Sequence, residues 1–274
     1  MTTDRMPQKV LRRLRWEPIA AIATVLLLWT VGSQFTPTFV IPPLTEVAGD
    51  LIRIFTDPQL LANVLVTLGR VGLGLGGAFL LGAALGLAMG VWPRFASYAL
   101  PLLTLTQGIP ALSWVVIAII WFQSVELRIW FIVLIVTLPG FVFQIYDAYR
   151  AIPEELREMA RSFRPRRFDL FRTVTLPAIL PDILTAWKVN LGLGVRVVLV
   201  AELVGAAVGV GYQLLKSQQL FDMVGVFAWT AVLVIFVLLV QNGITRLENH
   251  LLRYRPQQES DPSAARAKGT AAEA

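Results

Sequence analysis

The sequence predicts an all-α membrane protein, and its composition, its long apolar runs and the position of its charges are the observations that predict it. Of the 274 residues, 56% are hydrophobic and only 15% are charged, which is too apolar for a soluble domain of this size. The apolar runs are continuous and rich in Leu, Ala, Gly and Val, whereas strands of a membrane barrel would alternate polar and apolar residues. Helical spans are therefore expected.

Six apolar runs are long enough to cross a bilayer core of about 30 Å, which takes roughly 20 residues of helix. They cover Pro18 to Phe35, Leu65 to Val91, Ala99 to Phe122, Ile129 to Ala148, Ile179 to Val208 and Val224 to Ile244. A basic tail, residues 1–17, precedes a membrane domain over residues 18–248. Residues 249–274 lack periodicity and are expected to form a disordered cytoplasmic tail.

The first apolar run follows Arg12, Arg13 and Arg15, as the apolar part of a signal peptide would. The segment Gly32-Ser33-Gln34 offers no small-x-small cleavage site, so we expect an uncleaved first span. With the N-terminus inside, most Lys and Arg residues fall in segments that face the cytoplasm, where positive loops are retained. The protein is thus expected in the cell (inner) membrane as a multi-pass protein with both termini cytoplasmic.

The net charge of +6 lies beside membrane segments, so topology and contact with anionic membrane lipid explain it better than nucleic acid does. The chain has no cysteine and one histidine, His250. Without a nucleophile or ligand cluster around His250, the sequence predicts no catalytic residue, no metal site and no cofactor.

Between the first two spans, Thr45 to Phe55 is amphipathic and predicts an external helix near the membrane interface, with Thr45 as its N-cap. Asp57-Pro58 then predicts the start of the helix that becomes the second span, because Asp is a good N-cap and Pro suits the first helical position.

Glycines and prolines mark special positions within the spans. Gly82, Gly86 and Gly90 recur every four residues on the second span, so one face should let another backbone approach closely. Pro101, Pro110 and Pro139 are expected to interrupt the third and fourth spans, which is tolerable where the freed carbonyls face protein or a water-filled cavity.

The segment between the fourth and fifth spans is an arginine-rich polar island. Pro153 to Phe163 predicts a short helix with acidic residues in its first turn, where they complement the helix dipole. Pro165 disfavours helical geometry in Arg164, so the chain should turn there. A second short helix is expected over Pro165 to Thr175, with an apolar stripe formed by Phe168, Phe171 and Val174.

This island resembles the cytoplasmic loop of binding-protein-dependent ABC transporter permeases, whose pattern is E-A-A-x-x-x-G-x9-I-x-L-P. The matching positions are the acid Glu158, the alanine positions Met159 and Ala160, the isoleucine position Val174, and the final pair Leu176-Pro177. Arg164 stands where the pattern has glycine, so the turn must be built differently, and Pro165 is the residue available to build it.

The resemblance extends over about Leu65 to Leu247 and is greatest to the subfamily that imports sulfonates, taurine, nitrate and related nutrients. The similar segments are Thr67-Leu68-Gly69-Arg70, Ile109-Pro110, Trp121-Phe122, Ile152 to Leu156, Ala201-Glu202 and Gly209 to Tyr212. Two positions depart from the subfamily pattern: Gln123 replaces a glycine, and Gln144 replaces an asparagine.

The resemblance implies a fold similar to type I ABC importer permeases, with a coupling helix in the loop at about residues 150–178. That helix would enter a groove on cytoplasmic ABC ATPase subunits, with Glu158 meeting a basic residue and Phe168 and Phe171 supplying contact area. A permease homodimer and an extracytoplasmic substrate-binding protein are also implied. The chain itself lacks the G-x4-G-K-[ST] phosphate-binding motif, so it is not expected to be an enzyme.

Ionisable residues within spans are costly and usually face protein or water. Arg70 and Lys188 are expected to snorkel to the outer and the cytoplasmic interface. Arg196 and Glu202 are six residues apart and should not pair with each other, so each is expected to contact another helix or subunit. The candidate pathway or intramembrane polar residues are Arg70, Gln107, Gln144, Asn190, Arg196 and Glu202, with Thr104 and Ser113 as further polar positions.

Two functional hypotheses follow. The first is a permease subunit that forms the translocation pathway for a small solute and is driven by a separate ATPase. The second is an ion-coupled secondary transporter or channel that works without an ATPase, which would leave the polar island unexplained. For most of the polar residues in the spans, a role in helix packing competes with a role in the pathway.

Overall fold

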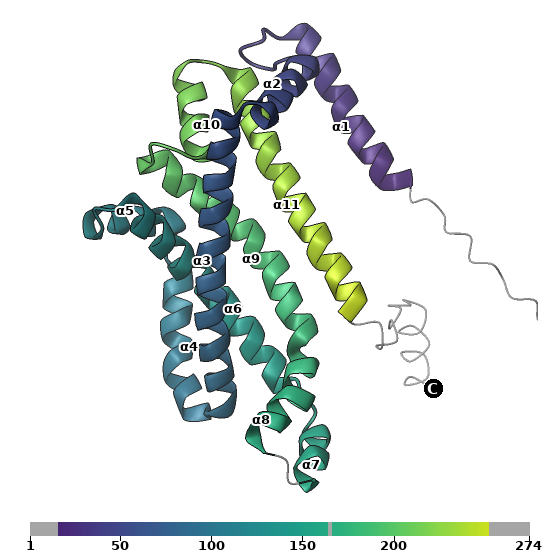
Figure 1. Cartoon of the computed structure of the whole chain (residues 1–274), viewed down its shortest axis with the longest axis vertical. Coiled ribbons are helices and arrows are strands. Elements are labelled where there is room, and N and C mark those ends of the chain that lie inside the picture. Colours follow the sequence, from purple (N-terminus) through teal and green to yellow (C-terminus); the bar gives the residue numbers. More distant parts are fainter. Residues whose placement is uncertain (1–15, 164–165, 252–274) are drawn as a thin grey trace, which may run out of the picture. The chain divides into compact units, whose positions relative to one another are not determined.

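The computed structural model describes residues 16–163 and 166–251. Helices follow one another along these residues, and no strand occurs among them (Figure 1). The helices are α1 (Trp16–Phe35), α2 (Leu44–Thr56), α3 (Pro58–Val91), α4 (Pro93–Gly108), α5 (Ala111–Trp121), α6 (Val125–Arg150), α7 (Glu154–Ser162), α8 (Arg167–Leu170), a π-helical turn (Phe171–Thr175), α9 (Leu176–Gly205), α10 (Val210–Gln219) and α11 (Met223–Leu251). The all-α prediction is confirmed.

Four helical segments within the described part are long and apolar enough to cross a membrane: α3, α6, the segment Phe168–Gly205 and α11. The pair α4 and α5 passes the same test when taken together, which raises the number to five. The apolar part of α1, Ala20–Phe35, is shorter than these spans. The prediction of several helical spans is thus confirmed, while the count of six is not established by these helices.

The chain divides into two units, and each is described by itself. The first contains residues 1–68 and 202–234, and the second contains residues 69–201 and 235–274. Helices α3, α9 and α11 each contribute residues to both.

In the first unit, α1 is held by Trp29. Its indole N–H donates a hydrogen bond to the carbonyl oxygen of Pro42 at 2.9 Å, and its ring lies 4.9 Å from the ring of Phe227. The predicted helix at Thr45 is present as α2, but Thr45 is not its N-cap. Pro43 occupies that position, with no side-chain hydrogen bond to the helix end.

The start of α3 is as the sequence predicts. The Asp57 carboxylate accepts a hydrogen bond from the backbone N–H of Gln59 at 2.8 Å, and Pro58 is the first helical residue. This capping bond satisfies one of the N–H groups that a helix start leaves without a partner. The helix begins seven residues before the apolar run at Leu65, because the cap and not the hydropathy defines its end.

In the second unit, α3 packs closely against α6 through its glycines. A Cβ atom on Gly82 would lie 2.7 Å from Cβ of Phe141, one on Gly86 would lie 2.8 Å from the carbonyl oxygen of Val142, and one on Gly90 would lie 2.4 Å from the Tyr149 ring. A Cβ atom does not approach another carbon or oxygen atom this closely without repulsion. The predicted close approach of two backbones is confirmed.

The third predicted span is not one helix. Helices α4 and α5 are bent by 94° relative to each other at the break between them. Ile109 has an extended backbone and Pro110 is the N-cap of α5, because a proline disfavours helical geometry in the residue before it. Pro110 interrupts the span as predicted.

The predicted interruptions at the two other prolines are wrong. Pro101 lies inside the continuous helix α4, and Pro139 lies inside the continuous helix α6. A single proline removes one backbone hydrogen bond, and packing in a membrane helix can compensate for that loss. Pro139 is buried among the packed helices of its unit, which provides such packing.

The polar island folds as α7, then α8 and the π-helical turn, which runs into α9 without a break. The first short helix is confirmed within one residue. The second is shorter than predicted, because only Arg167–Leu170 is α-helical before the π turn. The turn predicted at Arg164 and Pro165 lies outside the described residues. Helix α10, in the segment after the fifth span, was not predicted.

Candidate functional site

Helix α7 is a polar helix whose charges suit its ends. Glu154 and Glu155 lie in its first turn, where carboxylates stabilise the positive end of the helix dipole. Arg157 lies 3.5 Å from the Glu154 carboxylate and 4.6 Å from the ring centroid of Tyr149 on α6. The Arg157 guanidinium also donates a hydrogen bond to the Tyr149 carbonyl oxygen. These contacts join α7 to the end of α6.

An apolar cluster provides a second attachment for helix α7. Ala148, Ile152 and Ile179 are buried together, and Leu156 of α7 packs against them. The cluster combines residues of α6, of the segment after it and of α9. Helix α7 is therefore attached by both a cation–π contact and apolar packing to the membrane helices on either side of it in the sequence.

The opposite side of α7 is uncovered. Glu158 is exposed, Met159 is 57% exposed, and Phe163, just after the helix, is 80% exposed. Of the predicted coupling residues on this helix only Ala160 is buried. Exposed apolar side chains on a helix as charged as α7 are typical of a surface that another protein covers.

Beyond the turn, the predicted coupling residues differ in exposure. Phe168 on α8 is 68% exposed, whereas Phe171 and Val174 are half-buried. Leu176 and Pro177, at the start of α9, are exposed. Arg164 lies outside the described residues. The apolar stripe predicted over Phe168, Phe171 and Val174 is therefore only partly covered by the chain itself.

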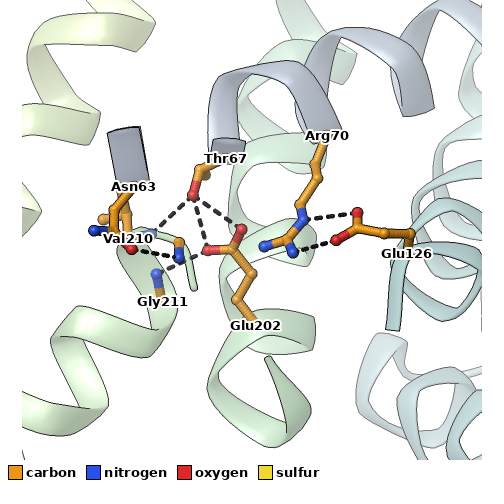
Figure 2. Close-up of polar contacts among 8 residues, drawn as sticks. Asn63, Thr67, Arg70, Glu126, Glu202, Val210 and Gly211 are labelled. Atoms are coloured by element: carbon orange, nitrogen blue, oxygen red, sulfur yellow. Dashed lines mark hydrogen bonds and ion pairs between the residues drawn. The ribbon is translucent and has the colours of Figure 1, made fainter. Parts of the chain in front are cut away.

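A second polar group surrounds the Glu202 carboxylate in the first unit (Figure 2). Glu202 is fully buried and accepts hydrogen bonds from the Thr67 hydroxyl at 2.9 and 3.0 Å and from the Gly211 backbone N–H at 2.8 Å. The Thr67 oxygen in turn accepts the N–H of Val210 at 2.8 Å. The predicted contact of Glu202 with another helix is confirmed.

The backbone around this carboxylate requires glycine at one position. Gly209 has φ of +121°, and a Cβ there would lie 2.5 Å from a Glu202 oxygen. Its N–H donates to the Asn63 side-chain oxygen at 2.9 Å. The Gly-Val-Gly segment thus brings the N–H of Gly211, in the first turn of α10, to a buried anion, an arrangement that helix N-termini favour. The bonds from the N–H groups of Gly209, Val210 and Gly211 fix this backbone segment, so we interpret the group as structural.

Arg70 is not a snorkelling residue, which corrects the sequence prediction. Its side chain is buried and pairs with the Glu126 carboxylate at the start of α6, with N–O distances of 3.0 and 2.5 Å (Figure 2). Lys188 likewise pairs with a carboxylate, that of Glu248 on α11. That Lys188 reaches the cytoplasmic interface stays a prediction; the structure adds a carboxylate partner 60 residues away that neutralises the charge locally.

The remaining candidate pathway residues are not brought together into one site by any contact in the described structure. Asn190 is buried and donates to the Ala186 carbonyl oxygen at 2.9 Å, which indicates packing. Gln107 is exposed on α4, Gln144 is half-buried on α6, and Arg196 is exposed on α9.

Sequence reasoning missed several partners: Asn63, Glu126, Glu248 and the pair of Arg157 and Tyr149. Each partner lies far along the chain or on another helix. The sequence contained one signal for these partners. Glu126 and Glu248 are acidic residues at the ends of apolar runs, where each could act as the counter-charge of a cation within a span.

Several apolar helices long enough to cross a membrane, joined by a charged helical loop, are compatible with a membrane protein of the transport permease class. The chain belongs to the family of binding-protein-dependent transport system inner membrane components, whose model matches residues 78–253. It is therefore a multi-pass inner membrane permease, the membrane-spanning component of a binding-protein-dependent ABC importer.

Relatives and a solved structure agree with this family. The taurine transport system permease protein TauC of Escherichia coli strain K12 is 27% identical over 88% of this chain and 93% of its own length. The formylaminopyrimidine transport permease protein ThiX of Halalkalibacterium halodurans is 26% identical over 88% of this chain and 97% of its own. An inward-facing structure of the MetNI methionine ABC transporter covers 71% of this chain and 99% of its own with a TM-score of 0.58; at 17% identity it supports the fold alone.

Proposed function

We propose that α7 is the coupling helix through which a cytoplasmic ABC ATPase drives this permease. The observation that carries the proposal is the exposure of Met159 on α7 and of Phe163 just after it, beside the charged residues of this helix. Apolar side chains in such a setting gain free energy when a partner covers them, at about 25 cal/mol per Å² of buried apolar area. Glu158, exposed beside them, offers a charge for a basic residue of the partner.

The attachment of α7 supports transmission of movement in both directions. Its Leu156 packs into the cluster of Ala148, Ile152 and Ile179. A displacement of α7 would therefore be transmitted through this contact to the ends of α6 and α9. Phe168 on α8 extends the exposed apolar surface. The further members of this proposed site are Ala160, Arg164, Phe171, Val174, Leu176 and Pro177. ATP hydrolysis would belong to the partner, because this chain lacks a phosphate-binding loop.

The proposed arrangement has six spans. Helix α1 and the bent pair α4 and α5 would each count as one span, in addition to the four long helices. The membrane domain would cover residues 18–248, and residues 1–17 and 249–274 would be cytoplasmic tails. Two copies of the chain would form the pore, with an extracytoplasmic binding protein delivering the solute and two ATPase subunits on the inner side.

The proposed substrate is a sulfonate, taurine, nitrate or a related small nutrient. Support comes from the resemblance to the importers of such solutes and from the taurine permease relative, which matches most of both chains. A formylaminopyrimidine permease matches to a similar extent, so overall similarity does not separate these substrates. Residues of the pathway have to make that distinction, together with the binding protein.

The test of the coupling helix is a charge reversal, Glu158→Lys. Tagged chain is purified in mild detergent from its own membranes, and the ATP hydrolysis that copurifies with it is measured. Because the reversed charge would face a basic residue, we expect roughly a tenfold loss of copurifying activity, which corresponds to about 1.4 kcal/mol. Glu46→Lys on α2 is the matched control, since Glu46 is also exposed.

Equal recovery of ATPase by Glu158→Lys and Glu46→Lys would remove Glu158 from the interface. The alternative function, an ion-coupled transporter or channel, makes a different prediction. Vesicles containing only this chain would then accumulate taurine or nitrate when an ion gradient is imposed. The permease proposal expects uptake only with ATP, the ATPase and the binding protein present.

A further inference from the structure

Arg196 occupies an unusual depth in its helix. Along α9 it follows Lys188 by eight residues and precedes Gly205 by nine. At about 1.5 Å per residue, Arg196 is about 12 Å from the first and about 13 Å from the second. Counted from Gly205, where the candidate span Phe168–Gly205 ends, Arg196 lies nearly halfway through a hydrocarbon core of about 30 Å. A snorkelling side chain needs a position near a helix end, which Arg196 does not have.

The face of α9 that bears Arg196 is uncovered within its unit. Val189, seven residues earlier, is 58% exposed, and Leu193, three residues earlier, is 38% exposed. Residues at these spacings share one side of a helix. Val195 and Val198, which point elsewhere, are buried. Arg196 therefore belongs to an exposed face and not to the packed side of the helix.

An arginine on such a face requires water or a counter-charge, because a charge in contact with hydrocarbon is costly. Two other cations of the described spans have carboxylate partners, Glu126 for Arg70 and Glu248 for Lys188. For Arg196 the described part of the chain provides no ion pair and no side-chain hydrogen bond. A counter-charge from outside the described residues would stabilise it there.

The carboxylates of the described spans lie away from Arg196. Glu202, six residues further along α9, is fully buried and hydrogen-bonded to Thr67 and Gly211. Glu126, Asp147 and Glu248 lie within three residues of a helix end, and Asp182 precedes Arg196 by 14 residues on α9. A mobile anion in water would supply the counter-charge that Arg196 needs.

We propose that Arg196 lines the water-filled translocation path and selects anionic solutes there. This inference rests on the proposed permease function and narrows its substrate to compounds with a carboxylate, sulfonate or nitrate-like oxyanion. The guanidinium offers a planar fork of N–H donors that matches such groups. Its charge also raises the local concentration of anions and lowers that of cations in a narrow path.

The absence of cysteine from the chain permits a direct test in membrane vesicles that contain the whole transporter. Leu193→Cys places a thiol three residues from Arg196. Its reaction rates with anionic 2-sulfonatoethyl methanethiosulfonate and cationic 2-trimethylammonioethyl methanethiosulfonate are measured, each divided by the rate with 2-mercaptoethanol. We expect the anionic reagent to react about tenfold faster. The preference should vanish with Arg196→Gln and persist with Arg196→Lys.

Val198→Cys is the control on the same helix, since Val198 is fully buried and should react with neither reagent. A thiol at 193 that also reacts with neither reagent would mean that the face is dry, and equal rates with Arg196 present would mean that its charge selects nothing. Either result overturns this inference. Copurification of the ATPase reports separately on the proposed permease function, so the two failures are distinguishable.

Discussion

The hydroxyl of Thr67 connects a side-chain carboxylate and a backbone N–H group. It donates to Glu202 and accepts the N–H of Val210, and both Thr67 and Glu202 are fully buried. Removing the hydroxyl leaves a buried carboxylate and a buried N–H with fewer partners, and each such group costs about 1–3 kcal/mol.

Thr67→Val keeps the shape of the side chain and removes only these bonds. For about 2–6 kcal/mol over the two groups, we expect the thermal unfolding midpoint of the purified protein in detergent to fall by about 4–24 °C, on the scale of 2–4 °C per kcal/mol for a chain of this size. Thr230→Val is the matched control, because the Thr230 hydroxyl is exposed and bonds only to the carbonyl four residues before it. Equal midpoints for the two variants would contradict a structural role for Thr67.

The sequence predicted what single residues need better than it predicted their partners. That intramembrane Glu202 must contact another helix followed from the cost of burying a charge. That its partners are Thr67 and the Gly211 backbone depended on how helices 135 residues apart fold together. Arg70 and Lys188 illustrate the same limit, because snorkelling is the prediction for a cation whose counter-charge is unknown.

At the scale of an element, the contact between α3 and α6 depends on the absence of side chains. Gly86→Ala would bring a Cβ within 2.8 Å of the Val142 carbonyl oxygen and 3.1 Å of the Ile145 Cβ. Backbone cannot move aside as a flexible side chain can, so overpacking should cost about 1–3 kcal/mol.

The control is Gly76→Ala on the same helix, where a Cβ would meet nothing within 4 Å. Alanine is the better helix former, so stability should stay level or rise by up to about 1 kcal/mol. Thermal unfolding in detergent of both variants checks the difference. If Gly86→Ala were as stable as Gly76→Ala, the close packing of α3 on α6 would be refuted.

Two helix boundaries in this chain are set by residues at the boundary itself. Asp57 and Pro58 set the start of α3, and the extended geometry of Ile109 before Pro110 ends α4. Pro101 and Pro139 carry the same local signal, yet their helices continue. Tertiary packing keeps the helix continuous at these two prolines. Which residues pack around a proline cannot be read from a single sequence.

For the whole molecule, the decisive question is which ends of the helices face the cytoplasm. The positive-inside distribution predicts that the α6–α7 connection is inside and the α5–α6 connection outside. Ala151 and Ser124, in these two connections, are both exposed. Because the chain has no cysteine, each can be converted to a single reporter thiol.

Ser124→Cys should react with a membrane-impermeant maleimide in intact cells, and Ala151→Cys should react only after the membrane is opened. Labelling of Ala151→Cys from outside would place α7 on the wrong side for an ATPase and would end the coupling proposal. Reaction of both thiols in opened membranes is the control for accessibility.

The π-helical turn at Phe171–Thr175 joins the proposed coupling surface to α9 without a break. A π turn holds one residue more than the α-helix around it. Shortening it by a single residue would allow regular α-helix throughout, and everything before it would be rotated by about 100° about the helix axis. The direction in which Phe168 faces around the helix axis is thus set by the one additional residue of the π turn. An insertion or deletion here would rotate the whole docking surface away from its partner without changing any residue of that surface.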